Sequence, residues 1–148
     1  MLQQITRRRE RLSQVPAVFW VVLALGIFFS IFAGGFFSIS NFLNIAVQSS
    51  VLLILALGAT IVILSEGIDL SAGSVLSFTG VITVLMMQQG IPTILAMLIG
   101  VAAGMGCGAI TGFLISVGKL PPFVATLAML GMAGGAAIVL TEAGAIYA

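Results

Sequence analysis

Long apolar stretches, separated by a few charged positions, dominate the pattern of the chain. The nine charged residues fall at positions 7–11, at Glu66 and Asp69, at Lys119 and at Glu142. They leave uncharged stretches of 54, 49 and 22 residues, at positions 12–65, 70–118 and 120–141. Because a membrane-spanning helix needs about 20 predominantly apolar residues, these stretches hold two, two and one spans.

Polar breaks within the stretches predict where each helix begins and ends. We expect five helices, over residues 17–36, 45–64, 72–89, 93–117 and 123–140. Residues 37–44 form a short connection in this interpretation, with Asn41 and Asn44 as turn or N-cap candidates. Gly90 and Pro92 separate the third helix from the fourth. The predicted fold class is an all-α polytopic membrane protein with about five transmembrane helices and glycine-rich helix packing.

The basic N-terminus predicts the orientation of the chain in the membrane. Residues 1–16 carry four arginines, and cytoplasmic flanks of membrane helices have the excess of Lys and Arg. We therefore expect residues 1–16 to be a cytoplasmic segment with the N-terminus inside, and residues 17–148 to form the transmembrane domain. A signal peptide is the alternative, but the apolar stretch exceeds about 7 to 15 residues and lacks an A-x-A-like cleavage site, which favours an uncleaved helix.

Composition excludes several classes of protein. Of the 148 residues, 61% are hydrophobic and 6% are charged, against roughly 25% charged in an ordinary soluble domain. A soluble globule is therefore excluded, and the partner implied is the lipid bilayer. The one short basic cluster offers no surface for nucleic acid. Cys107 is the only cysteine and there is no histidine, so an internal disulfide and a cysteine metal site are also excluded.

Glycines follow helical spacing in two of the expected helices. They recur at intervals of four at Gly100, Gly104, Gly108 and Gly112, and again at Gly131 and Gly135. Helices in a bilayer associate by close backbone approach, which such stripes of small residues allow. We interpret these glycines as helix-packing positions, the alternative being a direct role in a transport pathway.

Three polar residues inside the expected spans are candidates for lining a pathway. Gln48 lies near a helix end, where its amide either reaches the interface or faces a polar cavity. Ser49 and Thr60 carry hydroxyls that can bond to carbonyls of their own helix or across helices. For both hydroxyls, such structural bonding is a simpler interpretation than a role in a pathway.

The polar segment SEGIDLSAGS, at residues 65–74, concentrates the candidate chemistry of the chain. Its candidate site residues are Glu66, Gly67, Asp69, Ser71 and Gly73. Gly67 can end the preceding helix, while Asp69 or Ser71 can cap the following helix by accepting its free N–H groups. Alternatively, the turn borders a water-filled path, because acidic groups at membrane depth are tolerated only where they face protein or water. Spacing alone leaves both interpretations open.

Two motifs carry a resemblance to a known family. GIDLSxG occupies residues 67–73, and KLPPF followed by a threonine-leucine pair occupies residues 119–123 and 126–127. Together with NFLNIAVQSS at residues 41–50, they closely resemble the membrane permease subunits of ribose-type ABC importers, which take up monosaccharides and related small polar solutes. The chain departs from the family at Ala72, where valine is usual, at Gly134 and Gly135, where many members have arginine, and near Thr111, in place of an asparagine.

The resemblance implies a subunit of the plasma (inner) membrane that forms a translocation path by alternating access. It implies three protein partners: an ATP-binding-cassette ATPase, a periplasmic or lipid-anchored sugar-binding protein, and a second permease subunit in a homodimer. The ATPase, rather than this chain, is expected to bind ATP and Mg²⁺, and this chain is expected to bind no cofactor. Family permeases have a second half of similar size, so we expect the chain to be an N-terminal portion or a truncated product.

Other functions remain open on the residues themselves. A small ion-coupled transporter or channel would use Glu66 and Asp69 as proton or cation sites within the membrane. A non-transporting truncated permease fragment would use its glycine stripes to bind another membrane protein. An enzyme is not expected, because the chain lacks a histidine, a G-x-S-x-G elbow and a recognisable base beside Cys107.

Overall fold

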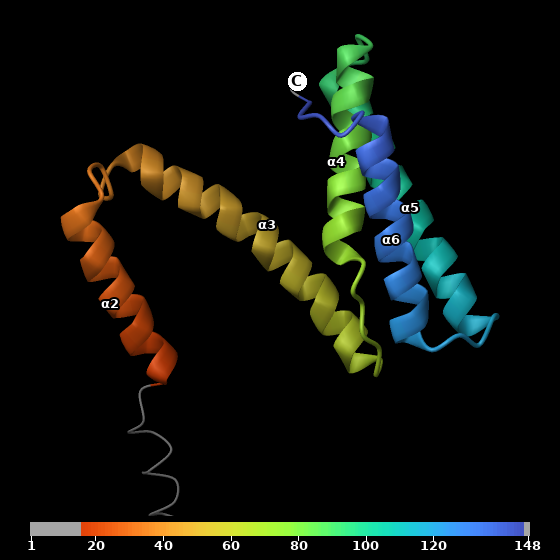
Figure 1. Ribbon diagram of the computed structural model, residues 1–148, viewed down its shortest axis with the longest axis horizontal. Helices are drawn as coiled ribbons and strands as arrows, with labels where there is room; N and C mark the ends of the chain where they lie inside the picture. Colours follow the sequence, from red (N-terminus) through yellow and green to blue (C-terminus); the bar gives the residue numbers. More distant parts are fainter. Residues whose placement is uncertain (1–15, 147–148) are drawn as a thin grey trace, which may run out of the picture. The chain divides into compact units, whose positions relative to one another are not determined.

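The computed structural model describes residues 16–146, which form five α-helices and no β-strand (Figure 1). In chain order these are α2 (Ala17–Phe32), α3 (Ile39–Leu64), α4 (Ala72–Gln88), α5 (Thr93–Ser116) and α6 (Pro122–Leu140). The predicted all-α class is confirmed for this part of the chain. The predicted basic segment lies outside the described residues except for Pro16.

The connection between α2 and α3 is shorter than predicted. α2 ends at Phe32 rather than at position 36, and α3 begins at Ile39 rather than at position 45. The prediction that residues 37–44 form a non-helical segment was therefore wrong, since most of them belong to the first turns of α3.

Ser38 is the residue that starts α3 early. Its hydroxyl accepts the Asn41 N–H at 3.2 Å, which satisfies one of the free donors of the first helical turn. The Asn41 side-chain amide donates to the Phe36 carbonyl at 2.7 Å. Asn41 therefore ties α3 to the preceding turn from inside the helix, and neither it nor Asn44 is the N-cap that the sequence suggested.

The remaining helices begin and end within one residue of their predicted positions. α4 ends at Gln88, α5 ends at Ser116, and α6 begins at Pro122. Proline is favoured at the first helical position because its missing N–H has no intrahelical role there and its φ is already helical. The predicted break at Gly90 is confirmed: Gly90 has φ +84°, and the N–H of Ile91 donates to the Met86 carbonyl at 3.1 Å, as in a Schellman motif.

Two compact units divide the chain, Met1–Val51 and Leu52–Ala148. In the second unit α4, α5 and α6 pack against one another (Figure 1). The buried apolar residues of the described chain come from α5 and α6 and are Ala96, Ala125, Met129, Ala133 and Ala137. Four of these five are alanines, so the helices meet through small side chains.

Part of the α5 glycine stripe lies directly against α4. A Cβ added to Gly100 would collide with the Thr83 hydroxyl and lie 3.1 Å from the Thr79 carbonyl oxygen. One added to Gly104 would lie 3.2 Å from the Thr79 methyl group. These two glycines therefore permit the close approach of α4 and α5.

The glycines of α6 do not form its packing surface. Gly131 and Gly135 are exposed, and a Cβ added to either would meet no atom within 4 Å. The face that packs is instead the four-residue series Ala125, Met129, Ala133 and Ala137. Small residues occupy more than one face of α6, so spacing alone did not indicate which face the neighbouring helices cover.

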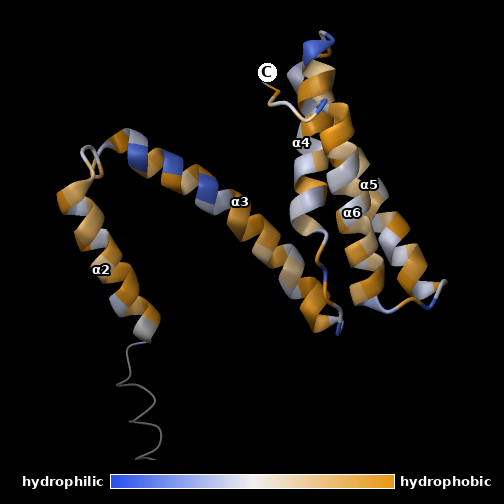
Figure 2. Cartoon of the chain, viewed as in Figure 1, coloured by the Kyte–Doolittle hydropathy of each residue, from blue (hydrophilic) through white to orange (hydrophobic). Residues whose placement is uncertain are grey.

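The described helices have the length and composition of a membrane protein. Among them α3, α5 and α6 are long and apolar enough to cross a membrane, and two shorter apolar helices are Val18–Phe32 and Ala72–Gln88. Large apolar side chains are exposed along α5 and α6. Hydrophobic positions predominate on both helices in Figure 2, whereas hydrophilic positions gather in the first half of α3 and at the far end of α4. A helix that is apolar all round is typical of a membrane span or a large core.

We predict that Gly100→Ala destabilises the packing of α4 on α5. Overpacking of this kind costs about 1 to 3 kcal/mol, because the new methyl group meets the Thr83 hydroxyl. Gly106→Ala is the matched control, since nothing lies within 4 Å of its position, and the helix propensity of alanine should stabilise it by about 0.5 to 1 kcal/mol. Thermal unfolding in detergent measures both. Thr83→Ala should reduce the cost of Gly100→Ala, and strictly additive effects would contradict the contact.

Candidate functional site

The turn between α3 and α4 begins with a Schellman motif that contains a glutamate. The N–H of Gly67 donates to the Val62 carbonyl at 3.0 Å, and the N–H of Glu66 donates to the Ile63 carbonyl at 3.0 Å. Glu66 occupies the left-handed position of this motif, with φ +58°. Gly67 is closely surrounded, because a Cβ there would lie 3.1 Å from Val62 Cγ1 and 3.3 Å from the Val62 carbonyl oxygen.

Asp69 organises the second half of the turn. Its Oδ1 accepts the Ser71 N–H at 2.7 Å and the Ser71 hydroxyl at 2.7 Å. Ser71 stands at the N-cap position of α4, but the prediction that Asp69 or Ser71 accepts a free N–H group of that helix was wrong, because no side-chain cap bond forms there. The Ser71 backbone is already helical and its hydroxyl turns back to Asp69, so the carboxylate closes the turn before the helix begins.

Thr126 joins this turn to α6. Its hydroxyl lies 3.0 Å from the Ile68 carbonyl, across 58 positions of sequence, and 2.9 Å from the Pro122 carbonyl of its own helix. Thr126 is 3% exposed whereas Ile68 is 56% exposed, so the hydrogen bond joins a buried side chain to an exposed turn. The GIDLSxG and KLPPF motifs thus meet in space, at the end of the second unit where α4 and α6 both begin.

Thr126 is the site residue that our sequence reasoning missed. It was counted as part of the second motif and was not named as a functional residue. Its position four residues after Pro122 gave the one available signal, since a motif threonine on the first turn of a helix can bond beyond that helix.

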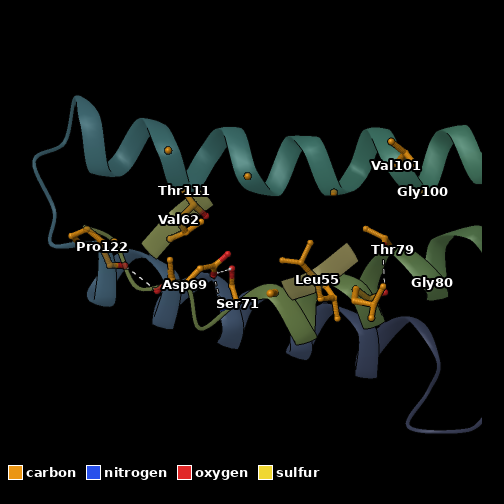
Figure 3. A pocket seen from close by; sticks show the side chains of 18 of the residues that line it. Leu55, Val62, Asp69, Ser71, Thr79, Gly80, Gly100, Val101, Thr111 and Pro122 are labelled. Atoms are coloured by element: carbon orange, nitrogen blue, oxygen red, sulfur yellow. Dashed lines mark hydrogen bonds between the residues drawn. The ribbon is translucent and has the colours of Figure 1, made fainter. Parts of the chain in front are cut away.

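A groove of about 1020 Å³ opens beside this turn. Figure 3 shows Asp69, Ser71 and Pro122 at one end of it and Thr79, Gly80, Gly100 and Val101 toward the other. Its walls come from the second half of α3, one face of α4 and one face of α5. Among the described residues that line the groove, Asp69 is the only one with a charged side chain.

The predicted site residues divide between the groove and other places. Gly67, Asp69 and Ser71 line the groove. All four glycines of the α5 stripe also line it, namely Gly100, Gly104, Gly108 and Gly112, whereas Gly131 and Gly135 do not. Glu66 lies in the same turn and Gly73 lies in the first turn of α4, and neither residue lines the groove.

The candidates for lining a pathway lie elsewhere. Thr60 is exposed outside the groove lining, and its hydroxyl donates to the Ala56 carbonyl at 2.7 Å. Gln48 and Ser49 are exposed residues of the N-terminal unit.

The arrangement works through hydrogen bonds and packing. Within the described residues, no group of three or more His, Cys, Asp or Glu side chains could hold a metal ion. The turn instead combines a strained left-handed residue, an aspartate that closes its own loop and a buried threonine that reaches across to it. Such a turn can connect the position of one helix to that of another.

We predict that Thr126→Val destabilises the second unit by about 0.5 to 1.5 kcal/mol, because the Ile68 carbonyl loses its donor from α6. Thr126→Ser keeps the hydroxyl and should cost much less. Thr60→Val is the control, since Thr60 is exposed and bonds only within its own helix. Thermal unfolding in detergent distinguishes the three variants, and equal stability of the Val and Ser variants at position 126 would rule out the bond as a stabilising contact.

For Asp69 we predict that asparagine is tolerated better than alanine. The Asn side chain keeps an oxygen that can accept from the Ser71 N–H and hydroxyl, whereas Ala loses both bonds at a cost of about 1 to 2 kcal/mol. Unfolding temperatures of the two variants, at equal membrane insertion, provide the comparison. If both variants were equally damaged, the charge of Asp69 would matter more than its hydrogen bonds.

Comparison with known proteins places this turn and its helices in a family of transport proteins. Residues 41–147 match the family described as the permease component of the branched-chain amino acid transport system. This range contains the α3–α4 turn, the groove and Thr126. No solved structure matches the chain.

Three curated relatives show how much of a longer protein the chain covers. Probable ABC transporter permease protein y4mJ of Sinorhizobium fredii is 38% identical over 138 residues, covering 93% of this chain and 40% of y4mJ. The ribose import permease protein RbsC of Escherichia coli K12 is 39% identical over 107 residues, covering 72% of this chain and 33% of RbsC. The D-allose transport system permease protein AlsC of the same strain is 34% identical over 140 residues, covering 88% of this chain and 43% of AlsC.

The chain thus spans less than half the length of these relatives. Three of its described helices are long and apolar enough to cross a bilayer, and the family match covers most of the sequence. The chain is a multi-pass membrane protein that belongs to the family of branched-chain amino acid transport system permease components.

Proposed function

We propose that the chain forms part of the permease subunit of an ATP-binding-cassette importer for monosaccharides or related small polar solutes. The observation that carries this proposal is the family match over residues 41–147. Relatives named for the import of ribose and D-allose give the class of solute. Because the chain spans less than half of those relatives, this activity belongs to the complete permease.

The partners in this proposal are those of an importer. A separate ATPase subunit binds ATP and Mg²⁺ and hydrolyses the nucleotide, while this chain binds no cofactor of its own. A periplasmic or lipid-anchored sugar-binding protein delivers the solute, and a second permease subunit completes a homodimer. In the plasma (inner) membrane the arginines at positions 7–11 hold the N-terminus on the cytoplasmic side.

Alternating access requires that helices shift together between two arrangements. The α3–α4 turn suits such a role, because Asp69 fixes its shape and Thr126 attaches it to α6. A displacement of the first turn of α6 therefore pulls on the Ile68 carbonyl and on the end of the groove. In this proposal Glu66 and Asp69 serve the conformation of the turn, in contrast to an ion-coupled transporter, in which they would carry protons or cations.

Uptake into membrane vesicles tests the proposal. The vesicles contain the complete permease that includes this chain, together with its ATPase and its substrate-binding protein. We expect labelled ribose or allose to accumulate only with hydrolysable ATP, and not when the ATPase is left out. Uptake driven by a proton gradient alone would instead show an ion-coupled transporter. No uptake, with the proteins still purifying together, would show a non-transporting fragment, and either result contradicts the proposal.

A further inference from the structure

The groove beside the α3–α4 turn has the dimensions of a seat for a helix. Its lining positions on α5 recur every three or four residues along one face, at Met97, Gly100, Val101, Gly104, Gly108, Thr111, Gly112 and Ile115. At a rise of about 1.5 Å per residue this face is about 27 Å long, close to the roughly 30 Å of a bilayer core. A compact solute would need only a fraction of that length.

The part of the α5 glycine stripe that extends beyond its contact with α4 is not covered by other residues. Gly100 and Gly104 are covered by Thr79 and Thr83, whereas a Cβ added at Gly108 or Gly112 would meet no atom within 4 Å. The opposite wall is α3, which contributes Leu55 and Val62 and has no buried residue. The α5 backbone is therefore accessible along its last turns, as close helix packing requires.

The hydroxyls in the walls already donate within the protein. Thr79, Thr83 and Thr111 donate to carbonyls of their own helices at 2.8 to 3.0 Å. Ser65 donates to the Val62 carbonyl at 2.8 Å, and Ser71 donates to Asp69. Each hydroxyl has one proton, so these side chains offer acceptors and no free donors to the groove. A polyol needs both, whereas the apolar face of a helix needs neither.

The length of the relatives indicates what kind of segment fills the groove. y4mJ, RbsC and AlsC are each more than twice as long as the region that this chain matches. The residues outside that region leave ample length for further membrane helices of about 20 residues each.

We propose that a transmembrane helix from the part of the permease outside these 148 residues fills the groove, with its backbone against Gly108 and Gly112. This inference rests on the proposed function, because it assumes that the chain works within a longer permease. The helix packs between α3 and α5, and Leu55, Val62 and Val101 surround it with apolar side chains. Close approach of its backbone to Gly108 and Gly112 determines how deeply this helix sits in the groove.

A matched pair of glycines on α5 gives the first test. Gly108 and Gly106 are both open in this structure, but only Gly108 lines the groove. In the complete permease, Gly108→Leu should lower the yield of folded, monodisperse protein by about tenfold, while Gly106→Leu leaves it within about twofold. Equal yields of the two variants would overturn the proposal.

Photocrosslinking in native membranes identifies the occupant directly. We place p-benzoylphenylalanine at Val101, which is 60% exposed and lines the groove, and at Met105, which is 71% exposed and does not. Mass spectrometry of the adduct at position 101 should find a helix of the permease beyond these 148 residues, and position 105 should not give the same peptide. An adduct at position 101 with lipid alone, or with a second copy of this chain, would overturn the proposal.

The transport assay keeps the two proposals apart. A lipid adduct at position 101 in a permease that still imports ribose with ATP would refute the helix seat and leave the importer function intact. The expected helix adduct in a permease without ATP-driven uptake would refute the importer function instead.

Discussion

The α3–α4 turn leaves the Ile68 carbonyl outside any helix, and the arrangement of the second unit depends on the partner that α6 supplies to it. The α3–α4 turn interrupts the helical hydrogen bonds between Leu64 and Ala72. Thr126 reaches the Ile68 carbonyl from α6 at 3.0 Å, and Asp69 takes up the Ser71 N–H. Throughout the described residues, no buried side-chain nitrogen or oxygen lacks a hydrogen-bond partner. The need to pair backbone polar groups that leave a helix thus attaches the turn to the packed helices.

The packing of α4, α5 and α6 follows from a second constraint. Helices in lipid gain little from burying apolar side chains, so they associate where small residues let the backbones approach. Gly100 and Gly104 meet Thr79 and Thr83 on α4, and α6 uses alanines. The same stripe on α5 continues past its partner to Gly108 and Gly112, where it becomes the open wall of the groove. One face of α5 therefore packs against α4 at Gly100 and Gly104 and stays open along the groove at Gly108 and Gly112.

Much of the fold could be predicted from the sequence, because charges and helix breakers are strong signals in an apolar chain. Glu66, Asp69 and Lys119 mark the two turns at one end of the second unit, and Gly90 and Pro92 mark the turn between α4 and α5. The start of α3 was missed because Ser38 and Asn41 make local hydrogen bonds that no hydrophobic pattern reveals. The packing face of α6 was missed because glycines and alanines of similar spacing lie on different faces.

The candidate site was located more reliably than its contacts. The GIDLSxG segment pointed to Gly67, Asp69 and Ser71, all of which line the groove. Their bonding was a matter of backbone geometry: Ser71 is already helical, so its hydroxyl turns to Asp69 instead of capping α4. The bond from Thr126 to Ile68 joins residues 58 positions apart, and a single sequence contains no periodicity that reports such a contact.

The central claim is that the α3–α4 turn lies against the start of α6. A Cβ at Gly67 would stand 3.9 Å from the Pro122 Cβ, within the range of about 3.5 to 4.5 Å that a disulfide requires. The most direct test is therefore the pair Gly67→Cys and Pro122→Cys in a Cys107→Ser background, oxidised in native membranes. We expect rapid formation of an intramolecular disulfide once Val62, whose Cγ1 and carbonyl oxygen lie 3.1 and 3.3 Å from this Cβ position, shifts by a few tenths of an ångström. Failure of the pair to crosslink in correctly inserted protein would contradict it.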